Sequence, residues 1–313
     1  MSTVDSAEAG EGEDDAVCAS CGITALDNVK LKKCACKLVQ YCGVECQKNH
    51  RPHHKKACKK RLAEVRDDLL FRQPNESYLG ECPICYLPLP IDEEYGINRS
   101  TSKINSCCCK RICLGCSYAN KLRAKKQAHH SKCPFCRESL PTGESDEDLY
   151  QIQTRRLMKR VEANDPVALR QMGLISVSKE IGQYDAASAA ALGNAEAHFN
   201  LSCMYHEGVV EENVKKQVYH LEEAAIGGHP MARFNLGCIE WHSSERYDRA
   251  SKHWVVAAKL GYDNALEKVK KCFMDGFVSK EAYEAALRGH QAAVDATKSE
   301  QRDAAYKYRQ RKK

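Results

Sequence analysis

The sequence predicts a mainly α-helical chain in which two small cross-brace modules, folded around metal ions, precede an α-solenoid of helix pairs. Three observations support this prediction. Residues 18–58 hold eight cysteine or histidine side chains at metal-ligand spacing, and residues 82–136 hold a second group of cysteines. The pattern Ala-Ala-x-x-Gly-x-x-x-Ala then occurs four times after residue 188. Short ligand-rich segments fold around metal, whereas recurring helix pairs stack into a solenoid.

Composition limits the class of protein. The chain has 313 residues, 29% of them charged, 7% aromatic and 19 of them cysteine, and its length suggests two or three domains. We find no apolar run of about 18 residues and no apolar segment of a signal peptide, so neither a membrane span nor secretion is expected. We therefore expect a cytoplasmic or nuclear location, or both, where cysteines at ligand spacing bind zinc instead of forming disulfides.

Charge is strongly segregated along the chain. Residues 1–17 carry six acids and no base, which predicts a disordered acidic tail, while residues 30–61 carry eleven Lys or Arg and a single acid, Glu45. A basic run is either a nucleic-acid surface or a solvated one. Only one aromatic residue of the Phe, Trp and Tyr type, Tyr41, lies among these bases and no base-reading motif accompanies them, so nucleic acid is an unlikely partner.

The first module, residues 18–58, has enough ligands for two zinc ions, since zinc in structural sites takes four. The ligands are Cys18, Cys21, Cys34, Cys36, Cys42, Cys46, His54 and Cys58. The pairs Cys42/Cys46 and His54/Cys58 have the i, i+4 spacing that directs two side chains from one face of a helix. His50 and His53 compete with His54, but neither has a cysteine four residues later.

Tyr41-Cys42-x3-Cys46-Gln47 followed by His54-x3-Cys58 resembles a MYND zinc finger. The resemblance implies that Cys18, Cys21, Cys42 and Cys46 share one zinc and that Cys34, Cys36, His54 and Cys58 share the other. The spacing Cys34-x-Cys36 departs from the family, which usually has two intervening residues. MYND fingers dock short proline-containing peptides and are not catalytic by themselves. A helical bridge is then predicted over residues 59–80, until Pro74-Asn75 breaks the helical pattern.

The second module has three Cys-x2-Cys pairs, and the sequence leaves the fourth pair open. The pairs are Cys82/Cys85, Cys113/Cys116 and Cys133/Cys136, and the fourth comes from two of Cys107, Cys108 and Cys109, which we assign as Cys107 plus either Cys108 or Cys109. Joining the first pair with the third in chain order, and the second with the fourth, gives a cross-brace with two more zinc ions, four in the chain. His129 and His130 are reserve candidates without ligand spacing.

Residues 81–140 resemble a RING domain in more than their ligands. In RING ubiquitin ligases an apolar residue between the first two ligands, a proline after the seventh and a cation after the last contact the ubiquitin-conjugating enzyme. Ile84, Pro134 and Arg137 stand at these positions. A RING usually has a histidine three residues before its fifth ligand, but this sequence has Lys110 there, three residues before Cys113.

Residues 141–158 are predicted to be an acidic linker in which helix resumes near Leu149, and residues 159–293 a helical repeat array. The repeat glycines are Gly193, Gly228, Gly261 and Gly289, spaced 35, 33 and 28 residues apart. Each unit is predicted to be one helix that ends at the glycine and a second that starts just beyond it. The array resembles Sel-one-like repeats, and residues 294–313 are predicted to form a basic C-terminal helix that caps it.

The whole arrangement resembles multidomain proteins of diatoms and related algae, and two functional hypotheses follow. In the first, the chain is a RING-type ubiquitin ligase: its MYND finger and repeats recruit substrate, and its second module binds a ubiquitin-conjugating enzyme. In the second, it is a non-enzymatic adaptor that binds proteins through all three parts, including an unknown ligand on the solenoid. No nucleophile–base pair or phosphate-binding glycine loop points to a small-molecule enzyme.

Overall fold

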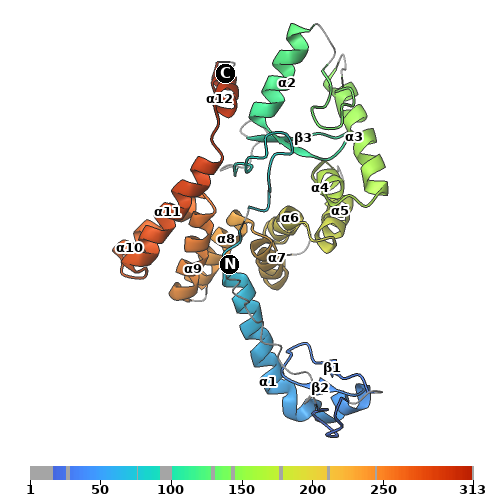
Figure 1. Cartoon of the computed structure of the whole chain (residues 1–313), viewed down its shortest axis with the longest axis vertical. Coiled ribbons are helices and arrows are strands. Elements are labelled where there is room, and N and C mark those ends of the chain that lie inside the picture. The colour runs from blue at the N-terminus through green and yellow to red at the C-terminus, as the bar shows by residue number, and fades with distance from the viewer. Residues whose placement is uncertain are drawn as a thin grey trace, which may run out of the picture. The chain divides into compact units, whose positions relative to one another are not determined.

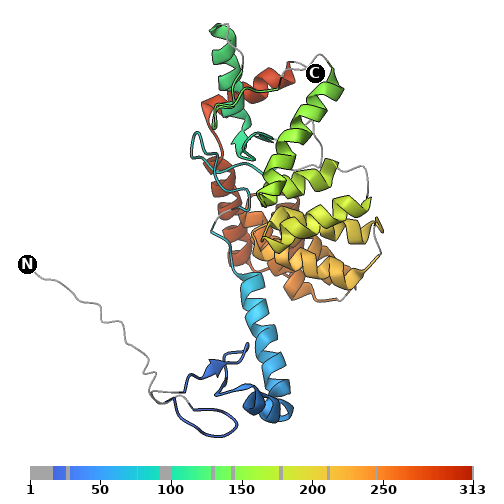
Figure 2. The ribbon, with the colours of Figure 1, turned by 90° about the vertical axis from the view of Figure 1, so that its right-hand side faces the viewer.

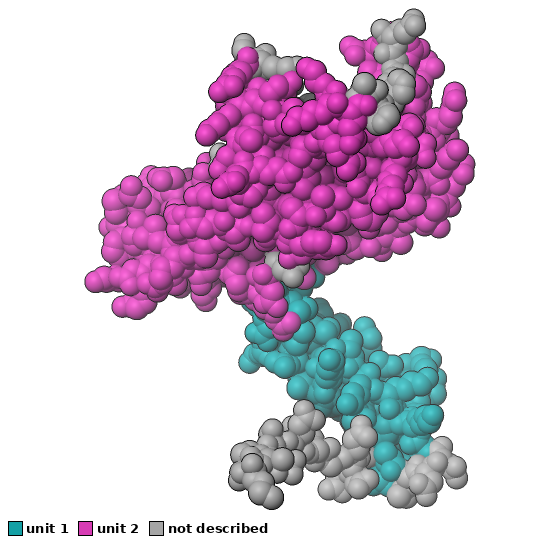
Figure 3. All heavy atoms as spheres, turned by 45° about the horizontal axis from the view of Figure 1, so that its top comes forward, with its two compact units in different colours: residues 1–70 teal, residues 71–313 magenta. Residues whose placement is uncertain are grey.

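The computed structural model describes residues 17–25, 29–75, 77–91, 101–127, 131–141, 145–175, 179–209, 212–243 and 245–311. The chain divides into two compact units, Met1–Leu70 and Phe71–Lys313, which Figure 3 shows in different colours. The predicted acidic tail, except for Val17, and the reserve ligands His129 and His130 lie outside the described residues.

The first unit combines a two-stranded sheet with one long helix. β1 (Lys32–Lys33) pairs antiparallel with β2 (Gln40–Tyr41), in the register Lys32 to Tyr41. The helix α1 (Val44–Phe71) then continues for 28 residues. The predicted bridge is therefore the C-terminal part of a helix that already carries ligands, and it ends shortly before Pro74 because proline disfavours helical backbone in the preceding residue.

The second module opens the second unit as a hairpin followed by a helix. β3 (Ser102–Ile104) pairs antiparallel with β4 (Arg111–Cys113), and α2 (Leu114–Lys126) follows directly. Leu89 and Ile112 are buried among the cysteines of this module. So small a core, made largely of cysteines, matches the expectation that metal binding supplies much of the folding energy.

Among the described residues, nine helices, α3 to α11, form the solenoid, and each packs on the next in chain order (Figures 1 and 2). They are α3 (Asp146–Glu162), α4 (Pro166–Ile175), α5 (Lys179–Ala191), α6 (Ala195–His206), α7 (Val214–Ile226), α8 (Pro230–Ser243), α9 (Tyr247–Lys259), α10 (Asp263–Met274) and α11 (Lys280–Ala296). The mainly α-helical class and the solenoid of helix pairs are confirmed.

Three of the four repeat glycines make the predicted turn. Gly193, Gly228 and Gly261 have φ of 81°, 86° and 91°, which glycine adopts without strain, and each follows the end of a helix. Gly289 lies instead inside α11, where a Cβ would come 2.8 Å from Cγ of Lys259. The prediction was wrong for this copy, because here the glycine serves a close approach of two helices and not a turn.

The segment predicted as an acidic linker contains the start of a helix. Ser145 caps α3, because its hydroxyl accepts from the backbone N–H of Asp148 (3.1 Å) while the Asp148 carboxylate accepts from the N–H of Ser145 (3.2 Å). Asp146, Glu147 and Asp148 occupy the first turn of α3, where the helix dipole favours negative charge. The helical array therefore begins at Asp146.

Ion pairs and ring contacts tie the second module to the solenoid within the second unit. Arg111 on β4 pairs with Glu196 on α6 at 2.6 Å, and Glu196 also pairs with the buried Arg170 at 3.1 Å. The buried His229 stacks between Tyr78, at 4.2 Å, and Phe199. The strand that leads into Cys113 is therefore anchored on α6 and, through Glu196, on α4.

The C-terminal helix α12 (Glu300–Gln310) does not follow the predicted course. It packs against α2 of the second module, as both ribbon views show (Figures 1 and 2), instead of capping the solenoid. Among the described residues, no helix is long and apolar enough to cross a membrane.

His253 on α9 is a buried histidine without hydrogen-bond partners among the described residues. Burial, reinforced by the charges of Arg233 and Arg249, lowers the pKa of its imidazole to about 3. The nearest carboxylate oxygen, on Glu240, is 3.9 Å from Nε2, beyond hydrogen-bond distance. This histidine is therefore neutral in the folded chain, but it takes up a proton near pH 6.5 when the chain unfolds.

We expect His253→Phe to raise the free energy of unfolding by about 1–2 kcal/mol near neutral pH, since it removes two unpaired buried nitrogens. Below the unfolded pKa the gain should grow by up to about 1.4 kcal/mol per pH unit, because only the wild-type chain gains a proton on unfolding. Urea unfolding at about pH 7.5 and about pH 5.5 measures both effects. The exposed His206→Phe is the control, and a gain that stays constant with pH would contradict the assignment.

Candidate metal centres

Four groups of four ligand side chains come together among the described residues, two in each module. Within each group, the four ligand atoms lie within 4.8 Å of one another. In chain order the tetrads are Cys18-Cys21-Cys42-Cys46, Cys34-Cys36-His54-Cys58, Cys82-Cys85-Cys113-Cys116 and Cys107-Cys108-Cys133-Cys136. Each of the predicted cysteine ligands and His54 belongs to one tetrad, except Cys109, while the reserve candidates His129 and His130 lie outside the described residues.

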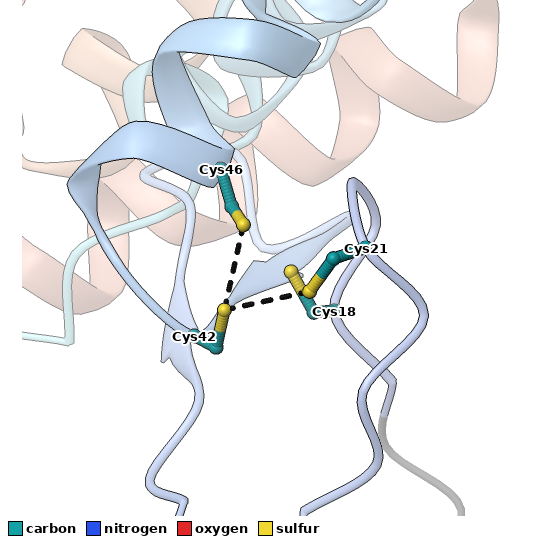
Figure 4. A group of neighbouring side chains, drawn as sticks. All are labelled: Cys18, Cys21, Cys42 and Cys46. Atoms are coloured by element: carbon teal, nitrogen blue, oxygen red, sulfur yellow. Dashed lines mark hydrogen bonds between the residues drawn. The ribbon is translucent and has the colours of Figure 1, made fainter.

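The first tetrad joins a turn, a strand end and the first turn of α1 (Figure 4). Sγ of Cys42, just after β2, lies 3.6 Å from Sγ of Cys21 and 3.5 Å from Sγ of Cys46. Cys18 is held beside them, because its N–H donates to Ile23 O and the Ala19 N–H donates to Gln40 O on β2. The short sheet thus fixes the distance between the two ligand pairs.

The second tetrad takes two ligands from consecutive turns of α1. His54 Nε2 lies 3.1 Å from Sγ of Cys36, and Sγ of Cys58 lies 3.8 Å from Sγ of Cys34. His50 instead pairs with the hydroxyl of Tyr41 at 3.0 Å and stacks on the His54 ring. The one-residue spacing of Cys34-x-Cys36 still brings both thiols to the site.

The third and fourth tetrads interlock as a cross-brace. In the third, Sγ of Cys85 lies 3.8 Å from Sγ of Cys113. In the fourth, Sγ of Cys108 lies 3.9 Å from Sγ of Cys133, and Sγ of Cys136 lies 3.4 Å from Sγ of Cys107. Because the pairs alternate along the chain, the loss of either ion would release a segment that also belongs to the other site.

A shared backbone turn explains why Cys109 is not a ligand. The residue after the second cysteine of a pair has positive φ in five places: Gly22, Lys37, Tyr86, Cys109 and Arg137. At each, the backbone N–H donates to a carbonyl three or four residues back, as from Cys109 to Asn105 (2.8 Å). Cys109 occupies the position of Tyr86 and Arg137, beyond the last ligand of its turn. Its side chain is buried with Leu157 and Ala168.

Lys37 is a non-glycine residue held at φ 60°, and its side chain is exposed. A left-handed conformation costs a residue with a Cβ about 1–2 kcal/mol. Glycine avoids this cost, but it loses more conformational entropy on folding, which offsets part of the gain. We expect Lys37→Gly to raise the free energy of unfolding of the zinc-loaded chain by about 0.5–1 kcal/mol. Thermal unfolding measures this, with the strand residue Lys33→Gly as control. A loss of stability for Lys37→Gly equal to that of the control would contradict the expectation.

The ligand sets suit zinc, and within the tetrads some thiols have lowered pKa values while burial and neighbouring thiols raise others, such as that of Cys58 to about 11. Backbone N–H groups, above all that of Cys21, lower the pKa of the Cys18 thiol to about 6. Burial would raise the pKa of Cys85, yet the Leu87 backbone and Arg302 together lower it to about 7. Three tetrads offer four thiols and one offers three thiols with an imidazole, which are the ligand sets of structural zinc sites. Four protein ligands leave no open position, so these centres would supply folding energy and not metal-based catalysis.

The residues predicted to contact a conjugating enzyme lie on two Cys-x2-Cys turns of the second module, residues 82–85 and 133–136. We call these turns, and the equivalent turn before Cys109, knuckle turns. Ile84 is 37% exposed, Arg137 is exposed and Pro134 is partly exposed. Lys110 belongs to no tetrad, and its Nζ lies 5.8 Å from the centre of the exposed Phe135 ring. Arg302 on α12, which the sequence analysis missed, donates to the same turn as Ile84, at Leu87 O (3.2 Å).

Metal modules joined to a helical solenoid define the class of this protein: it is a zinc-finger and helical-repeat scaffold for protein interactions. Residues 18–58 match the model of the MYND finger family, which confirms the resemblance found in the sequence. A comparison with curated proteins gives no match.

Two solved structures are similar to part of the chain. One is c5321, a protective antigen of uropathogenic Escherichia coli with an SLR fold, at 19% identity and a TM-score of 0.40, over 45% of this chain. The other is a Sel1 repeat protein from Oxalobacter formigenes, at 19% identity and a TM-score of 0.41, over 54% of this chain. The chain covers 33% and 50% of these two proteins.

Proposed function

We propose that the scaffold is a RING-type ubiquitin ligase, in which residues 81–140 bind a ubiquitin-conjugating enzyme. The first module, through proline-containing peptides, and the solenoid would recruit the substrate. We propose that this takes place in the cytoplasm, the nucleus or both. The observation that carries the proposal is the exposure of Ile84 and Arg137 on turns that the third and fourth tetrads hold. An apolar side chain on a solvent-facing turn suits a partner surface better than a core.

These residues would act by orienting the thioester that the conjugating enzyme carries. Arg137 follows the last ligand, and its backbone N–H donates to Cys133 O (2.9 Å), so metal binding would fix where its side chain begins. A guanidinium offers a planar array of five donors and can bridge two partners at once. Holding a loaded thioester in one attack-ready pose accelerates its aminolysis without a nucleophile on this chain.

A reconstituted reaction tests the proposal. The zinc-loaded full chain, with ubiquitin, activating enzyme and a broad panel of conjugating enzymes, should build ubiquitin chains. Ile84→Ala should abolish them, since it removes the exposed apolar contact. Val214→Ala, at a residue of α7 that is 58% exposed, is the matched control and should leave them unchanged. Failure of every conjugating enzyme to give chains would overturn the proposal.

One observation favours a second function, that of a non-enzymatic adaptor. Lys110 replaces the usual RING histidine, and its charge lies over Phe135, beside the proposed contact surface. A cation at this place would weaken binding to a partner whose contacting surface is itself basic. In this case the protein binds partners through its three parts but makes no ubiquitin chains. Autoubiquitination that depends on Arg137 would exclude the adaptor function.

A further inference from the structure

The C-terminal helix α12 lies along α2 and contacts the third tetrad. Cys116 Sγ is 3.8 Å from Oε1 of Gln301, and the rings of Tyr118 and Tyr308 are 4.7 Å apart. Ala305, at the middle of α12, is only 2% exposed. Contacts therefore extend along the whole helix, although it is separated from the module by the entire solenoid in sequence.

Arg302 is the central contact. Its Nη1 donates to Pro88 O (2.7 Å) and Thr297 O (2.6 Å), and its Nη2 donates to Leu87 O (3.2 Å). Nη2 also lies 3.6 Å from Sγ of Cys85. One side chain thus holds the end of α11, the carbonyls that follow the first knuckle and a sulfur of the third tetrad.

Gly115 permits this approach. A Cβ at this position would come 2.9 Å from the backbone nitrogen of Arg302 and 3.0 Å from its Cγ. A backbone atom cannot give way as the end of a flexible side chain can, so any larger residue here displaces α12. Because Gly115 is inside α2, where alanine is the better helix former, packing against α12 accounts for its presence.

We infer that α12 is a clasp of the second module and that Arg302 is the positioning residue of the third tetrad. A zinc ion with four thiolates carries excess negative charge, and a guanidinium that donates to one thiolate stabilises it. Arg302 also fixes the turn from Cys82 to Pro88 through two backbone carbonyls, and this turn presents Ile84. The clasp therefore controls metal retention and, where the proposed ligase function holds, the affinity for the conjugating enzyme.

Zinc release from the full chain tests the first part. A chelator with a coloured zinc complex follows the loss of each of the four ions over time. In Arg302→Ala we expect one ion to leave about ten times faster than in the wild type, since loss of an outer partner typically weakens metal binding 10–100-fold. Lys307→Ala removes an exposed cation from the same helix and is the control. Equal release by the wild type and Arg302→Ala would overturn the inference.

Gly115→Ala provides a test that does not alter Arg302. If α2 only had to be helical, alanine would raise the unfolding midpoint of the chain. If α12 is a clasp, alanine should instead lower the midpoint and accelerate the release of the same single ion. A raised midpoint with unchanged release would contradict the clasp. Arg302→Lys, which keeps the charge but not the fork of donors, should release that ion at an intermediate rate.

Binding of a conjugating enzyme tests the second part, and its failure is distinguishable from failure of the ligase proposal. If the wild type binds and builds chains, Arg302→Ala should weaken binding several-fold although Ile84 is intact. Unchanged binding would overturn the inference that Arg302 fixes the turn that presents Ile84. If the wild type builds no chains with any enzyme, the ligase proposal fails, while the zinc-release result still decides whether Arg302 positions the metal site.

Discussion

Cys108→Ser is expected to remove at least one zinc ion per chain, whereas Cys109→Ser is expected to remove none. The two residues are adjacent, but only Cys108 is near another ligand, with its Sγ 3.9 Å from that of Cys133. Cys109 follows the knuckle turn at φ 54° and packs against Leu157 of α3. The substitutions are chemically identical, so each is the control of the other.

The effect of Cys108→Ser should be large, because a structural zinc site contributes on the order of 10 kcal/mol to folding. With three thiols left, the fourth tetrad binds zinc weakly, and the cross-brace transmits the loss to the third. Elemental analysis of the purified variants measures zinc, and limited proteolysis within residues 81–140 reports the opening of the module. Retention of four ions in Cys108→Ser together with loss of one in Cys109→Ser would reverse the assignment.

Trp254→Ala is expected to lower the free energy of unfolding of the solenoid by about 3–5 kcal/mol, the usual cost of removing a large buried ring. Trp254 on α9 is 2% exposed, and its Nε1 donates to Phe234 O at 3.2 Å. The indole also fills the space above Gly237, where any Cβ would collide with it. The variant therefore creates a cavity and removes the hydrogen bond to Phe234 O.

Urea unfolding followed by circular dichroism measures this loss, since most of the helical signal comes from the solenoid. Tyr219→Ala, at an aromatic residue of α7 that is 53% exposed, is the control and should change stability by less than about 0.5 kcal/mol. A comparable change for the two variants would mean that Trp254 does not pack as the structure describes.

Local spacing predicted most of the metal ligands, because a Cys-x2-Cys turn or an i, i+4 pair on a helix brings its two side chains together without help from the rest of the fold. Spacing did not resolve Cys107-Cys108-Cys109, where three adjacent thiols compete. The backbone resolves them: Asn105 O accepts the N–H of Cys109, as Cys82 O accepts that of Tyr86, so Cys109 lies past its turn.

The repeat pattern predicted helix pairs but not every role of its glycines. Three copies place glycine in a turn, whereas Gly289 lies inside α11 against Lys259. Both roles require a missing Cβ, so the residue type alone does not separate them. The start of α3 had a readable signal, since Ser145-x-x-Asp148 is a capping box, but its acidic neighbours led to a predicted helix start near Leu149, three residues too late.

The docking of α12 had no local signal at all. Arg302 contacts Cys85 across 217 residues of sequence, and its neighbours resemble any other basic, solvated helix. Gly115 did not predict this contact either, since a glycine after the first residue of a helix has no single interpretation. Such long-range contacts depend on the curvature of nine packed helices, which a pattern of apolar residues does not determine.

Zinc stoichiometry of the full chain tests the central claim most directly. Elemental analysis of protein purified without chelator should give four zinc ions per chain, two for each module. The sixteen tetrad side chains then account for all the cysteines except Cys109, Cys203, Cys238 and Cys272. Two ions per chain would contradict the account, because one of the two modules would then not be a pair of structural zinc sites.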